Sequence, residues 1–209
     1  MAKWTFCVAF AVAQVLLIPA GLPQSAGAPA SSSSESPPPM HVEGGTSLTQ
    51  LINSVARKTG RKYVIDPRVR GEAVLVGQDA TSVGFSDLLT ILLINSYTAV
   101  DYGTHVAVIP TASARQEPLP IITGKESRPE AEFVTRIITV KNVPATHLVP
   151  IIRPMIPQVG HFAALPCVNK LILVDTFGNV KRLSSLIEIL DVGEPYTPPK
   201  CATSEPGSR

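Results

Sequence analysis

The chain has 209 residues, of which 44% are hydrophobic and 16% charged, and its formal net charge is +2. This composition is ordinary for a folded globular protein, and the charge is too small to indicate strong electrostatic binding to nucleic acid. Lys3 is the only charged residue among the first 28, so the remainder is close to neutral and implies no polyanionic partner.

The amino terminus has the layout of a secretory signal peptide. Lys3 precedes an apolar run from Trp4 to Ile18, and small residues follow as far as Ala28. Because the run is short for a transmembrane helix, we predict a cleaved signal over residues 1–28. Cleavage after Ala30 is an alternative, and retention as an uncleaved anchor is another.

Three segments rich in proline and small or polar residues divide the rest of the chain. Residues 29–40 are predicted to be a disordered Ser/Pro leader, residues 111–132 a linker, and residues 192–209 a disordered tail. Between them lie two candidate modules, residues 41–110 and 133–191, each small for independent stability.

The first module begins with a predicted helix. Ser47 and Gln50 have the spacing of a capping box, and Gly60 can supply the left-handed residue that ends the helix. Between them the apolar residues fall on one helical face. This stripe comprises Leu48, Leu51, Ile52, Val55 and Ala56.

Short strands and a second helix complete the first module. Strands are predicted at Tyr63–Ile65 and Ala73–Val76, and a second apolar stripe predicts a helix from Phe85 to Leu93. Tyr97–Val100 and His105–Ile109 flank a turn and predict a hairpin.

The second module is predicted to have the order β-α-β-β-α. Its strands are Phe133–Val140, His161–Leu165 and Leu171–Val174, and a closing helix is opened by Gly178-Asn179 and runs to Leu190. The first helix, starting near Asn142, should be short or kinked because it contains two prolines, Pro150 and Pro154. Both modules therefore indicate an α+β fold, the second with both helices on one sheet face.

The sequence offers little catalytic or metal-binding chemistry. Its four histidines, His41, His105, His147 and His161, lack the paired spacing of zinc ligands. The motifs of serine hydrolases, P-loops and dinucleotide sites are missing too. We expect no enzyme activity, no metal, no cofactor and no small-molecule substrate. The second module lacks the G-x-x-G clamp of KH modules, so we expect no nucleic-acid partner.

Two cysteines follow the predicted signal, Cys167 and Cys201, in a compartment that permits disulfides. Pairing them requires the polar tail to fold back to within a few ångströms, which the sequence alone does not establish. A native bridge therefore stays open, but we expect a free or intermolecular Cys201.

Two stretches resemble the amino-terminal periplasmic domains of type II secretion system secretins. Thr59–Gly71 resembles the signature of the first domain, in which Asp66, Pro67 and Gly71 are the motif residues. The stretch from Asn142 through Gly160-His161 is similar to the KH-like (NolW-like) second domain. Its motif residues include Pro150, Pro154 and Asn169.

The resemblance implies a periplasmic module for protein contacts, associated with the outer membrane through a secretin complex. The expected partners are the inner-membrane coupling protein of type II secretion or a full-length secretin. Since no pore domain follows, we expect no channel and weak or no homo-oligomers. Either of two strands of the first module could be an edge that accepts a partner strand. The candidate contact residues are Tyr63, Val64, Ile65, His105, Val106 and Val108.

Two alternatives remain at this point. The first domain also resembles the signalling domain of TonB-dependent transducers, although this leaves the second module unexplained. A truncated secretin without function is the other alternative.

Overall fold

The structure is a computed structural model that describes residues 44–124 and 126–201. The predicted signal peptide and leader, with His41, lie outside the described residues, as do residues 202–209. No helix in the described part is long and apolar enough to cross a membrane.

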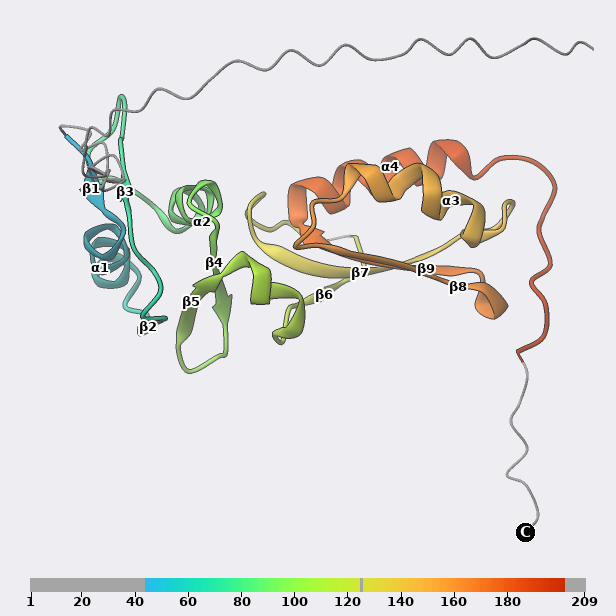
Figure 1. Cartoon of the computed structure of the whole chain (residues 1–209), viewed down its shortest axis with the longest axis horizontal. Helices are drawn as coiled ribbons and strands as arrows, with labels where there is room; N and C mark the ends of the chain where they lie inside the picture. The colour runs from blue at the N-terminus through green and yellow to red at the C-terminus, as the bar shows by residue number, and fades with distance from the viewer. Residues whose placement is uncertain (1–43, 125, 202–209) are drawn as a thin grey trace, which may run out of the picture. The chain divides into compact units, whose positions relative to one another are not determined.

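The first module packs two helices against a three-stranded sheet (Figure 1). Helix α1 (Leu48–Thr59) ends at Gly60, which adopts the predicted left-handed conformation with a φ of 66°. Its buried residues are those of the predicted stripe: Leu48, Leu51, Ile52 and Val55. The prediction of a capping box is wrong, however, because the Ser47 side chain makes no capping hydrogen bond.

Helix α2 (Phe85–Ile94) confirms the second predicted helix. The Asp87 carboxylate accepts a hydrogen bond of 2.9 Å from the Gly84 backbone N–H, which anchors the start of the helix. Four of its residues join the core of the module: Leu88, Leu89, Ile91 and Leu92.

The main sheet of the first module has the strand order β2-β5-β4. Strand β2 (Tyr63–Ile65) runs parallel to β5 (Val106–Pro110), and β4 (Tyr97–Asp101) pairs antiparallel with β5, as the predicted hairpin requires. A separate pair joins β1 (Thr46–Ser47) to β3 (Glu72–Ala73).

The predicted strand Ala73–Val76 is largely wrong. Only Glu72 and Ala73 pair with another strand, while Val74 and Val76 follow in irregular structure and are 53% and 89% exposed. The apolar run alternates in burial: Ala73 and Leu75 pack half-buried against the core of the module, whereas Val74 and Val76 face solvent.

The segment 111–132, expected to be a linker, is ordered wherever it is described. It forms a 3-10 helix, η1 (Thr111–Gln116), and strand β6 (Ile121–Ile122). Ala114 is fully buried, and Ala131 belongs to the hydrophobic core of the first module. The segment therefore carries secondary structure and buried side chains where it is described.

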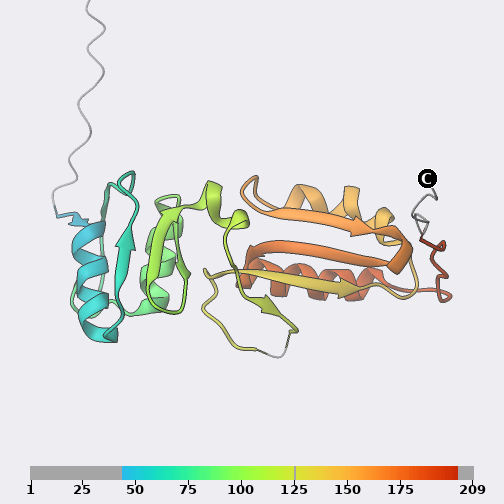
Figure 2. The same ribbon diagram turned by 90° about the horizontal axis from the view of Figure 1, so that it is seen from below.

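The second module confirms the predicted β-α-β-β-α order. Strands β7 (Phe133–Thr139), β9 (Lys170–Thr176) and β8 (His161–Leu165) form an antiparallel sheet, to which β6 adds a parallel edge. Helices α3 (Ala145–Ile152) and α4 (Phe177–Leu190) lie on the same face of this sheet (Figure 1). Figure 2 shows the opposite face, on which no helix lies.

The prolines of the second module act as expected. Pro150 lies inside α3, which has only eight residues and ends at Ile152. The chain then tightens into the 3-10 helix η2 (Arg153–Met155), which contains Pro154. Since proline lacks a backbone donor and crowds the preceding turn, a short helix is the physical outcome.

The chain after α4 departs from the expected disorder as far as it is described. Residues 192–201 return to the second module, and Cys201 forms a disulfide with Cys167, with the two Cα atoms 5.0 Å apart. The expectation of a free or intermolecular Cys201 is therefore wrong.

Candidate interaction surfaces

The signature residues of the first module have structural roles. The Asp66 carboxylate accepts hydrogen bonds from the Arg68 backbone and from both Nε and a terminal nitrogen of its guanidinium, at 2.8 to 3.0 Å. These bonds hold the pKa of Asp66 at about 2, below its ordinary value. Gly71 has a φ of 123°, which favours glycine, and its carbonyl accepts from the Leu48 N–H at the start of α1.

Asn169 is a motif residue of the second module and likewise has a structural role. It is 4% exposed and has a positive φ of 48°. Its side chain donates to the carbonyls of Val140 and Val143 and accepts from the Ala145 N–H, at 2.7 to 3.0 Å. Asn169 thus fixes the loop that connects β7 to α3.

The carboxylate of Asp191 holds the same loop from its other side. It accepts hydrogen bonds from the backbone N–H groups of Lys141, Asn142 and Val143, at 2.6 to 3.2 Å. Asp191 directly follows α4, so the loop is fixed to the end of that helix.

Only one of the two predicted edge strands lies at an edge. Strand β5 is the central strand, with Val106 and Val108 buried, so the prediction that His105, Val106 and Val108 form an edge is wrong. Strand order depends on pairing between distant segments, and no local pattern in the sequence reveals it.

Strand β2 lies at the edge, and its backbone is available on one side. The Lys62 carbonyl and the Asp66 N–H both form hydrogen bonds with β5. Because backbone groups alternate in direction along a strand, the N–H and C=O groups of Tyr63 and Ile65 point to the other side. No strand of the described part pairs there. Val64, between them, is 56% exposed.

An apolar surface next to β3 was missed by the sequence analysis. Val74 and Ile94 line one hollow of about 190 Å³ and are 53% and 79% exposed, and Val76 follows two residues after Val74. We call Val74 and Ile94, which line this hollow, the β3 surface. The sequence offered no clear signal for Ile94, because apolar residues fill most of α2, whether they are buried or exposed.

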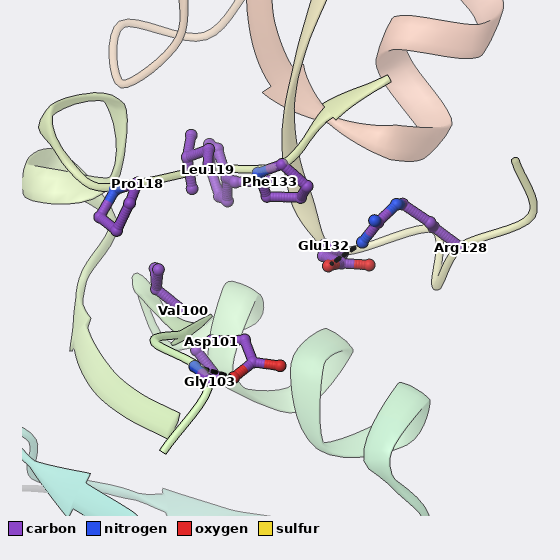
Figure 3. Close-up of a pocket in the computed structure, with 10 residues that line it drawn as sticks. Val100, Asp101, Gly103, Pro118, Leu119, Arg128, Glu132 and Phe133 are labelled. Atoms are coloured by element: carbon purple, nitrogen blue, oxygen red, sulfur yellow. Dashed lines mark hydrogen bonds and ion pairs between the residues drawn. The ribbon is translucent and has the colours of Figure 1, made fainter. Parts of the chain in front are cut away.

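Figure 3 shows an open cavity of about 290 Å³ between the β4–β5 turn and the segment that leads into β7. Its apolar lining includes Val100, Leu119 and Phe133. At its border the Arg128 guanidinium donates to the Glu132 carboxylate at 2.8 Å. No histidine, serine or cysteine lines it.

The two carboxylates beside this cavity differ in environment. Burial raises the pKa of Glu132, although the nearby Arg128 opposes the shift. The pKa of Asp101 is lowered, chiefly by the hydrogen bond of 2.8 Å from the Gly103 N–H, and Asp101 also pairs with Arg61. Since each carboxylate has an arginine partner, the pairs account for these charges without a bound ligand.

The helix-free face of the second sheet carries exposed apolar side chains. The strand register aligns Ile137, Ile172 and Ala163 across β7, β9 and β8. Ile137 is 49% exposed, and Leu165 on the same face is 40% exposed.

In the described residues, no group of three or more His, Cys, Asp or Glu side chains could hold a metal ion.

Comparisons with known proteins point to one family. A family model described as GspD-like, N0 domain, matches residues 44–109. The secretin XcpQ of Pseudomonas aeruginosa is 33% identical over 146 residues, which cover 69% of this chain and 21% of XcpQ. The secretin GspD of Vibrio cholerae is 26% identical over 152 residues, covering 70% of this chain and 23% of GspD.

A solved structure shares the fold. It is the type II secretion system outer membrane complex of Klebsiella pneumoniae, with PulD, PulS and the PulC HR domain. The match has a TM-score of 0.61 and 22% identity, and it covers 70% of this chain and 26% of the other. The α+β fold class is thereby confirmed. The present chain spans about a fifth of the length of the secretins that it matches.

Proposed function

The described residues carry the amino-terminal domains of the type II secretin family, and on that basis we propose that the chain is a periplasmic protein-interaction module of type II secretion. It acts by binding, not by catalysis. Its partner is an inner-membrane component of the secretion system or a full-length secretin. The observation that carries the proposal is the β3 surface, because exposed clusters of large apolar side chains are typical of protein contacts.

The Klebsiella complex contains a PulC HR domain, which suggests the type of protein domain that binds this chain. We propose that a PulC-like HR domain contacts the first module of this chain. The contact should be weak and reversible, because a module of this size offers a small area.

Two surfaces of the first module compete for this role, and a matched pair of variants separates them. Val74 on the β3 surface and Val64 on strand β2 are nearly equally exposed, at 53% and 56%. A lysine at either position adds the same charge. Within a contact, its ammonium group must lose water without a partner, which is costly.

The test is an NMR titration of the purified chain with a PulC-like HR domain of the same secretion system. We expect Val74→Lys to weaken binding at least about tenfold, equivalent to about 1.4 kcal/mol, and Val64→Lys to leave it unchanged. Unaltered spectra of both free variants control for folding. If only Val64→Lys weakens binding, the contact is strand addition at β2. Absence of shifts with the HR domain and with a full-length secretin would contradict the proposed function.

A further inference from the structure

Residues 192–201, which we call the strap, connect the end of α4 to the turn between β8 and β9. Cys201, at its far end, is disulfide-bonded to Cys167 in the 3-10 helix η3 (Pro166–Val168). In Figure 1 this segment leaves α4 and passes down beside the end of the second module. Midway, the Tyr196 N–H donates to the Lys141 carbonyl at 2.9 Å.

Apart from the disulfide, the strap makes few contacts with the module. Its residues are mostly exposed, and Tyr196 and Pro198 are half-buried. Cys201 itself is exposed, whereas Cys167 is half-buried. The disulfide and the Tyr196 hydrogen bond are thus its main attachments in the described structure.

The loop beneath the strap does not depend on it. The Asn169 side chain and the Asp191 carboxylate hold residues 140–145, and neither residue belongs to the strap. Opening the disulfide removes none of these hydrogen bonds. The fold of the module and the position of the strap are therefore separable.

We propose that the strap is a redox-controlled element, which a dithiol reductant releases while the second module stays folded. A thiolate of the dithiol attacks the sulfur of Cys201, which is an exposed residue, and Cys167 leaves as a thiolate. The second thiol of the reductant then resolves the mixed disulfide. Overall, two electrons and two protons pass to the protein, which gains two thiols, and the dithiol becomes a disulfide.

Release changes the reach of the chain after α4. In the oxidised form, Cys201 stays next to Cys167, with 5.0 Å between Cα atoms. In the reduced form, the segment from Val192 to Cys201 can extend about 30 Å at roughly 3.4 Å per residue. The inference does not depend on the proposed function, since it concerns only this end of the second module.

Reduction kinetics under native conditions provide the first test. The purified oxidised chain is mixed with increasing dithiothreitol, and free thiols are counted after quenching with iodoacetamide. If the sulfur of Cys201 is accessible in the folded state, doubling the dithiothreitol concentration should double the rate. A rate that is independent of concentration and limited by unfolding would overturn the proposal.

Amide exchange by NMR provides the second test. Reduction should bring the Tyr196 amide to within about tenfold of the rate of an unstructured amide, while the amides of Leu171 and Leu173 in β9 stay protected. The variant Cys201→Ser should show the same pattern without reductant. Continued protection of Tyr196 would show that the strap stays attached, and loss of protection in β9 would show that the module unfolds. Either result would refute the proposal.

Discussion

Replacing Asn169 with alanine should strongly destabilise the second module. The side chain satisfies the Ala145 N–H and the carbonyls of Val140 and Val143, at a position that is 4% exposed. Truncation leaves these groups without partners, and each buried unsatisfied group costs about 1–3 kcal/mol. Alanine must also adopt a positive φ, at about 1–2 kcal/mol.

The expected total for Asn169→Ala is about 4 kcal/mol, because the carbonyls recover part of their loss through water. Such a loss is a large fraction of the roughly 5–15 kcal/mol that stabilises a domain. Glycine at this position removes the same hydrogen bonds but tolerates the φ of 48°. Asn169→Gly should therefore be about 1 kcal/mol more stable than Asn169→Ala.

The measurement is urea unfolding of the oxidised chain, followed by the NMR resonances of Leu171 and Leu173 so that it reports on the second module. The two variants and the parent chain are compared at equal slope, where a shift in midpoint is a change in stability. A loss below about 1 kcal/mol in both variants would refute the role of the hydrogen bonds. Equal stability of the two variants would refute the contribution of the backbone conformation.

Three further changes test other parts of the structure. Cys201→Ser should lower the stability of the second module by up to about 3.8 kcal/mol by urea unfolding, since the bridge closes a loop with a sequence separation of 34; an unchanged midpoint would argue against the disulfide. Arg68→Ala should raise the pKa of Asp66 from about 2 toward its ordinary 3.8 in a carboxyl NMR titration, and an unmoved pKa would show that the ion pair does not set it. Burial raises the pKa of Asp175 above 3.8, so the folded state binds the proton of this carboxyl more tightly than the unfolded state does. The contribution of Asp175 to the stability of the fold therefore falls as the pH rises above 3.8. The stability of Asp175→Asn relative to the parent chain should therefore increase as the pH rises from about 4. Parallel curves of stability against pH for the two proteins would contradict this.

Local patterns predicted the helices well and the strand arrangement poorly. The stripe from Leu48 to Val55 predicted α1, because a helix buries residues three and four apart. The central position of β5 could not be predicted, because it depends on the parallel pairing of β2 with a strand about 40 residues later. Ala114 and Ala131 are single small residues in a proline-rich segment, so their burial left no pattern.

The disulfide also depended on tertiary structure. Its formation requires the chain after α4 to turn back, and two contacts guide that path: Asp191 on the backbone of the β7–α3 loop, and Tyr196 on the Lys141 carbonyl. Neither contact has a sequence signature, because both use backbone groups of the loop. Composition alone therefore indicated a disordered tail.

The residues that carry the family resemblance and those that suit a partner contact are different residues. Asp66, Gly71 and Asn169 satisfy backbone groups or adopt unusual backbone angles, so the fold itself requires them. Val74 and Ile94 contribute little to the core, because most of their surface faces solvent. Substitution of the first group should therefore change stability before binding. Substitution at the β3 surface should change binding while stability stays nearly constant. The Val74→Lys titration measures the binding, and an unaltered spectrum of the free variant checks that the module stays folded.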